Sequence, residues 1–109
     1  MNSLKTIVFY DSENVTDELV VMENNNLGSQ LVIEVSGSSS VVFNVEGIAD
    51  PANVDEWNRL AVIKAKDYTV STTISDTGIF YVGVDGIRKI RVNPVSVNGN
   101  VRVFGTLGN

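Results

Sequence analysis

Acidic side chains carry most of the reactive chemistry in this sequence, because histidine and cysteine are both absent. The chain therefore has no Ser-His or Cys-His nucleophile, no thiolate or imidazole metal ligand and no imidazole pH switch. Paired carboxylates can run acid and base chemistry without them. Asp55 and Glu56 stand beside Trp57, whose indole could stack on a sugar ring. Neighbours in sequence do not face one another across a substrate, so we expect a solvated loop with one aromatic anchor and no catalytic residue.

Metal and phosphate sites are also not indicated. Asp50, Asp55 and Asp85 offer the oxygen ligands that calcium prefers. The segment from Asp50 to Asp55 lacks the acidic spacing and the glycine of an EF-hand loop, and Asp85-Gly86 has the composition of a hairpin turn. No Gly-Lys-Ser/Thr phrase is present, which excludes a P-loop. We expect no metal and no cofactor.

Four basic residues stand close together in the last quarter of the chain: Arg88, Lys89, Arg91 and Arg102. On a strand, Lys89 and Arg91 share a face. Such a stripe either contacts an acidic partner or keeps an outer sheet face soluble and its edge unpaired. The net charge of −5 repels phosphate backbones and anionic membranes, so a protein partner is favoured over nucleic acid or a membrane.

Two aromatic pairs are further candidates. Phe80 and Tyr81 are consecutive in a strand-like run, so one of them must leave the core unless the strand is buried on both faces. Because an oligomer would cover such a second face, we add Phe80 and Tyr81 to the four basic residues as the candidate interaction surface. Trp57 and Tyr68 are the candidate contacts of an alternative function, in which loop aromatics bind a glycan or a receptor.

The elements that position these residues have a hydrophobic period of two, which is typical of β-strands. Apolar residues alternate over 31–35 and 41–45, and the small polar segment 37–40 between them can reverse the chain. We therefore predict two adjacent antiparallel strands. Asn98-Gly99 predicts another hairpin, because a type I′ turn needs positive φ at both central positions. Pro94 predicts an edge or a bulge.

Seven further segments have the composition of strands. They are Lys5 to Tyr10, Leu19 to Met22, Leu60 to Ala65, Thr69 to Ile74, Ile79 to Val84, Ile87 to Val92 and Val101 to Thr106. Turn residues separate most of them at about ten-residue spacing. The sequence thus predicts an all-β fold: a single antiparallel β-sandwich, jelly-roll-like or Ig-like, of about eight or nine strands.

Length and charge bound the organisation of the chain. Its 109 residues, 43% hydrophobic and 19% charged, suit one globular domain, with a core sandwich over 30–109 and a less regular strand or arm over 1–29. Residues 1–60 hold ten acids and two bases, whereas 61–109 hold six bases and three acids. The two halves either lie on separate surfaces and attract a partner, or interleave; we expect interleaving. Because no apolar stretch suits a signal peptide or a membrane helix, we expect synthesis in a cytoplasm.

Six phrases follow one another in a characteristic order: Ile33 to Gly37, Val41 to Gly47, Asp55 to Trp57, Thr77 to Gly86, Ile87 to Val92 and Gly99 to Gly105. Together they resemble a β-sandwich domain of small structural proteins from tailed bacteriophages and prophages. The resemblance implies a virion component without enzymatic activity: a head decoration or head-fibre protein, or a tail or baseplate module. It further implies a homo-oligomer, with a trimer as one form, that contacts a capsid or tail protein in the virion after synthesis in the bacterial host cytoplasm.

Overall fold

The computed structural model describes residues 5–12, 18–25, 28–37 and 40–108, and these residues form strands and loops without a helix. The strands are β1 (Lys5–Asp11), β2 (Val21–Glu23), β3 (Gln30–Gly37), β4 (Val41–Ile48), β5 (Asn58–Arg59), β6 (Val62–Lys64), β7 (Val70–Ser71), β8 (Gly78–Gly83), β9 (Lys89–Val97) and β10 (Val101–Gly108). Residues 38–39 of the predicted 37–40 turn, and 1–4, 13–17 and 26–27 of the predicted N-terminal arm, lie outside the described residues.

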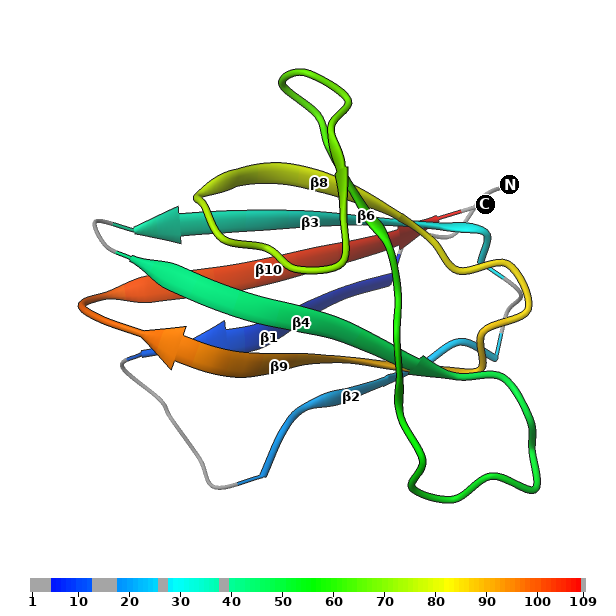
Figure 1. The fold of residues 1–109 in the computed structure, drawn as a ribbon. Helices are drawn as coiled ribbons and strands as arrows, with labels where there is room; N and C mark the ends of the chain where they lie inside the picture. Colours follow the sequence, from blue (N-terminus) through cyan, green and yellow to red (C-terminus); the bar gives the residue numbers. More distant parts are fainter. Residues whose placement is uncertain (1–4, 13–17, 26–27, 38–39, 109) are drawn as a thin grey trace.

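The strands form two antiparallel sheets that pack face to face (Figure 1). Sheet A has the order β1-β10-β3-β8-β6-β7, and sheet B has the order β2-β9-β4-β5. Alternate residues of both sheets are buried between them, as the fully buried side chains of Ile33 on β3 and Val45 on β4 illustrate. The predicted antiparallel β-sandwich is therefore confirmed, with ten strands rather than eight or nine because short pairings such as β5 carry no sequence signal.

The predicted hairpins at 37–40 and at Asn98-Gly99 are wrong. β3 belongs to sheet A and β4 to sheet B, and the Asn98-Gly99 turn likewise leads from β9 in sheet B to β10 in sheet A. Asp85-Gly86, also expected to be a hairpin turn, joins β8 in sheet A to β9 in sheet B. The strands on the two sides of each turn run in opposite directions (Figure 1). Gly99 and Gly86 adopt positive φ, but Asn98 and Asp85 do not, so the type I′ turn predicted at Asn98-Gly99 is also wrong. The reversed strands then meet through their apolar faces instead of their backbone edges, because burying those faces needs a second layer.

The strand register shifts at two positions, and the residue types there explain both shifts. Pro94 continues β9 and lies opposite Phe43, at a register shift between Val42 and Phe43 of β4, so the predicted bulge is confirmed. A second shift in β1 places Phe9 in the core, with its ring against Gly105 of β10. A Cβ atom at position 105 would lie 2.5 Å from Cε2 of that ring, so the close approach requires glycine.

The acidic and basic halves of the chain interleave, as expected. Arg91 on β9 donates from Nε to Oε1 of Glu46 on β4 at 2.7 Å. Arg102 on β10 has its guanidinium 3.9 Å from a carboxylate oxygen of Asp11 on β1. Both pairs join the basic half to the acidic half, and they do so on different sheets.

Candidate interaction surface and polar groove

The outer face of sheet A carries a row of side chains that crosses all six strands and is apolar on four of them, β3, β8, β6 and β7. Strand register places Val32 beside Tyr81, Tyr81 beside Ile63, and Ile63 beside Val70. Thr106 and Thr6 continue the row on β10 and β1. The residues before and after Val32 are buried in the sandwich, so alternation directs Val32 and its neighbours in the row outward.

A second row runs beside the first. It places Val8 beside Phe104, Phe104 beside Glu34, and Glu34 beside Ile79. Ile79 is 43% exposed and Val70, in the first row, is 64% exposed. The apolar members of both rows form the apolar part of the outer face of sheet A. They are Val8, Val32, Ile63, Val70, Ile79, Tyr81 and Phe104. Val70 and Ile79 are exposed and the other five are half-buried, so the face offers apolar surface that a partner could cover.

The outer face of sheet B carries more polar groups, although Val21 beside Arg91 is 38% exposed on it. Glu46, Arg91 and Asn93 lie there, with Asn93 Nδ2 3.4 Å from Glu46 Oε1. The Arg91 guanidinium also covers the Trp57 ring at 4.3 Å from the ring centroid. These contacts hold the 49–57 loop against the charged sheet, so Trp57 is an aromatic anchor whose ring already carries a stacked cation.

The structure divides the candidate interaction surface predicted from the sequence. Arg102 and Tyr81 lie on the outer face of sheet A, whereas Lys89 and Arg91 lie on β9 of sheet B and Arg88 directly precedes it. Because Arg91 and Arg102 are paired with acids and occupy different sheets, the four basic residues form no single stripe. Alternation in β9 is as predicted, with Ile90 and Val92 buried.

Phe80 was wrongly included in the predicted interaction surface. Its side chain is 3% exposed and faces the core, where Ile33 lies beside it on β3. Tyr81 faces the other way and joins the apolar row. The two aromatics therefore do face opposite sides of β8, and only Tyr81 is available to a partner on this face.

Tyr68 lies far from Trp57 in the fold. It is at the tip of the β6–β7 hairpin, which projects at the top of Figure 1, whereas the 49–57 loop lies at the lower right. Tyr68 is 73% exposed and has φ of 60°, a left-handed conformation that is strained for an aromatic residue. Its N–H donates to the carbonyl of Lys64 at 2.7 Å, which fixes the tip. Trp57 and Tyr68 thus form no common site.

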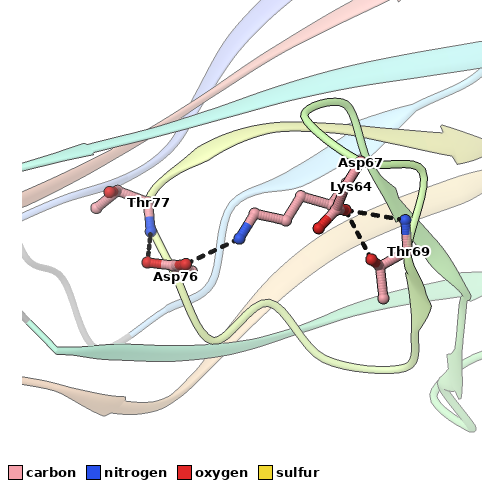
Figure 2. Close-up of polar contacts among 5 residues, drawn as sticks. All are labelled: Lys64, Asp67, Thr69, Asp76 and Thr77. Atoms are coloured by element: carbon pink, nitrogen blue, oxygen red, sulfur yellow. Dashed lines mark hydrogen bonds and ion pairs between the residues drawn. The ribbon is translucent and has the colours of Figure 1, made fainter.

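The inner side of the same hairpin forms a groove of about 270 Å³ together with the 73–76 segment. Its lining residues are Val62, Lys64, Asp67, Thr69, Ser71, Thr73, Ser75, Asp76 and Phe80. Figure 2 shows the charged groups of this groove, with Lys64 Nζ 2.8 Å from Asp76 Oδ2. Asp67 Oδ1 accepts from the Thr69 hydroxyl at 2.6 Å and from the Thr69 N–H at 3.0 Å.

These contacts keep the charged groups of the groove ionised. The hydrogen bond to Asp76 raises the pKa of Lys64 above its ordinary value, and the hydrogen bond from Lys64 lowers the pKa of Asp76. The hydroxyl and N–H of Thr69 lower the pKa of Asp67. Asp76 also accepts from the N–H of Thr77 at 3.1 Å. At neutral pH the groove therefore holds one cation and two anions.

The groove was not found by sequence reasoning, although a signal for it exists. Hydroxyl residues occupy every second position at 69, 71, 73 and 75, and all four line the groove. Period-two hydroxyls normally mark the solvent side of a strand, and the sequence does not show that this side closes against a second segment. Within the described ranges no three His, Cys, Asp or Glu side chains gather as a metal site, and no helix there is long and apolar enough to cross a membrane.

The fold class is an antiparallel β-sandwich, and solved structures share it. The SPBc2 prophage-derived protein YomS superposes with a TM-score of 0.83 at 18% identity, covering 100% of this chain and 96% of that one. The PBSX exported protein XepA superposes with a TM-score of 0.80 at 16% identity, covering 99% of this chain and 38% of that one. At these identities the likeness concerns the fold. No protein-family model and no curated protein sequence matches the chain.

Proposed function

We propose that this chain is a non-enzymatic structural protein of a phage or prophage particle, a capsid decoration or head-fibre-type accessory that acts by protein–protein contacts. The observation that carries the proposal is the apolar outer face of sheet A. The order of the sequence phrases supports a virion role. The structure of YomS, which has the same fold, supports it as well, because that protein is described as prophage-derived.

The outer face of sheet A has the character of a contact surface. The apolar members of the two rows together span six strands, which at about 4.8 Å spacing is about 24 Å. That width suits a patch of roughly 800 Å², the share that each partner contributes to a standard interface. An apolar sheet face is well covered by another apolar sheet face, so the occupant that we assign to it is a second copy of this chain, in a dimer or a trimer.

The more polar outer face of sheet B suits the side of the molecule that lies outside the contact between copies. Sheet B presents paired charges and the anchored 49–57 loop, which are typical of a polar rim or a solvent-facing side. In this proposal a capsid or tail protein is the second partner and the virion is the location. The net charge of −5 disfavours nucleic acid and anionic membranes as partners.

The oligomeric state tests the assigned contact. Size-exclusion chromatography with light scattering should give an oligomer for the native chain and a monomer for Ile79→Lys, which places a charge in the middle of the face. Val54→Lys is the matched control, because Val54 is 78% exposed in the 49–57 loop and lies outside the face. A native chain that stays monomeric at about 1 mM, where even a weak contact of about 4 kcal/mol would show, refutes self-association.

The location needs its own experiment. Particles purified from an induced lysogen that carries this gene should contain the chain in many copies, measured by quantitative mass spectrometry against the major capsid protein. The Ile79→Lys chain should be depleted from the particles and the Val54→Lys chain should not. Particles that lack the native chain would refute the virion role while leaving the oligomer result standing.

A further inference from the structure

The groove inside the β6–β7 hairpin is not used by the contact proposed above. Its walls come from the hairpin and from the 73–76 segment, and Ile74 within that segment exchanges two 2.8 Å backbone hydrogen bonds with Phe43 of β4. Val70 of the hairpin points to the outer face of sheet A, whereas its neighbours Thr69 and Ser71 line the groove. Assembly through the outer face therefore leaves the groove open.

The lining is rich in hydroxyl groups. Thr69, Ser71, Thr73 and Ser75 alternate along the chain, so their side chains lie on the same side of it. The Ser71 hydroxyl accepts from the Thr73 N–H at 3.2 Å, which fixes the bend between β7 and the 73–76 segment. A hydroxyl both donates and accepts hydrogen bonds, so such a lining matches a ligand that is itself polyhydroxylated.

The charges of the groove argue against an anionic ligand. The Lys64 ammonium is held by Asp76 at 2.8 Å, and Asp67 contributes a second carboxylate. One cation and two anions give the lining a net charge of −1, which repels phosphate. Each carboxylate offers about four lone-pair positions, so both can still accept from the hydroxyls of a neutral ligand.

The volume of the groove also matches a small saccharide. A volume of about 270 Å³ lies just below the roughly 300 Å³ at which drug-sized sites begin, which suits one or two sugar rings. Phe80 and Val62 also line the groove, but they are 3% and 1% exposed, so the groups open to a sugar are the hydroxyls and carboxylates. Tyr68 stands between Asp67 and Thr69 in a strained backbone conformation, an arrangement that is common at binding sites.

We propose that the groove between the β6–β7 hairpin and the 73–76 segment binds an uncharged saccharide. The hydroxyls of Thr73 and Ser75 exchange hydrogen bonds with those of the sugar, and Asp67 and Asp76 accept from it. This moves sugar recognition away from Trp57, whose ring is stacked by Arg91. The inference goes beyond the structural role proposed above and does not depend on it.

Amide chemical shifts in ¹⁵N-labelled protein test the groove directly. The probes are glucose, galactose and N-acetylglucosamine, with sodium phosphate as the anionic comparison. At least one sugar should shift the amides of residues 69–76 with a Kd of about 1 mM, the range expected for a few hydrogen bonds to a small ligand. Phosphate should leave these amides unchanged. No shift with any of the three sugars, or a larger shift with phosphate, overturns the proposal.

Variants assign the binding to the hydroxyl lining. Thr73→Val with Ser75→Ala removes two hydroxyls and should weaken sugar binding about tenfold or more. Thr72→Val is the matched control, because Thr72 adjoins Thr73, is exposed and does not line the groove. Equal affinity in the double variant and the control overturns the assignment. Ile79→Lys should keep native sugar affinity, which separates this result from the oligomer test.

Discussion

Asn24 provides the sharpest test of how this sandwich is held together. The residue is 5% exposed and follows β2. Its Nδ2 donates to the carbonyls of Gly28 at 3.0 Å and Ile87 at 2.8 Å, with a longer contact of 3.3 Å to Val84. Its Oδ1 accepts from the Gly28 N–H at 2.8 Å. One amide thus joins the β2–β3 connection of the chain to the β8–β9 turn.

The cost of Asn24→Ala follows from the groups that it leaves without these partners. The Val84 carbonyl keeps the Ile87 N–H at 2.9 Å. The Gly28 N–H, the Gly28 carbonyl and the Ile87 carbonyl each lose the bond to Asn24. At about 1 kcal/mol for each such group, Asn24→Ala should lower the free energy of unfolding by about 3 kcal/mol. That is a large share of the roughly 5 to 15 kcal/mol of a small domain.

Equilibrium urea unfolding, followed by circular dichroism, measures this loss. Asn25→Ala is the matched control, since Asn25 is exposed and adjacent. The control should stay within about 0.5 kcal/mol of the native chain. Asn24→Asp should lose at least as much as Asn24→Ala at pH 7, because a carboxylate keeps the acceptor and loses both donors. A loss below about 1 kcal/mol for Asn24→Ala, with an unchanged urea dependence, would refute the reasoning.

Three further outcomes are expected. Lys64→Met should raise the pKa of Asp76 toward its ordinary value, as measured by an NMR titration. In the native chain the lowered pKa of Asp76 preserves the Lys64–Asp76 ion pair until strongly acidic pH. The raised pKa of Lys64 preserves the same ion pair until strongly basic pH. Gly105→Ala, with Cβ 2.5 Å from the Phe9 ring, should cost about 1 to 3 kcal/mol in thermal unfolding. Arg91→Met should change the fluorescence of the single tryptophan, and an unchanged spectrum would contradict the stacking.

The local character of the chain was readable from its residues. Period-two alternation placed the core positions of β3, β4 and β9 correctly, since each strand buries one face whatever it pairs with. Pro94 marked the irregularity in β9, because proline lacks the N–H of a regular ladder. The opposite orientations of Phe80 and Tyr81 followed from the same alternation.

The pairing of strands could not be read in the same way. β3 and β4 run in opposite directions, as do β9 and β10, yet each pair is divided between the two sheets. A tight turn leaves two ways to bring consecutive apolar strands together, edge to edge or face to face. The choice depends on which other strands complete each sheet, and that information is distributed over the whole chain.

The outer surfaces of the two sheets were also only partly predictable from the sequence. The residues alone predicted a β-sandwich without histidine or cysteine chemistry. They also predicted that Lys89 and Arg91 share a strand face and that Tyr81 or Phe80 leaves the core. The folded chain was needed to show that Arg102 lies on the other sheet from Arg91 and that apolar residues align across sheet A. The physical reason is that alternation along one strand fixes a side chain's face, whereas register between strands fixes its neighbours.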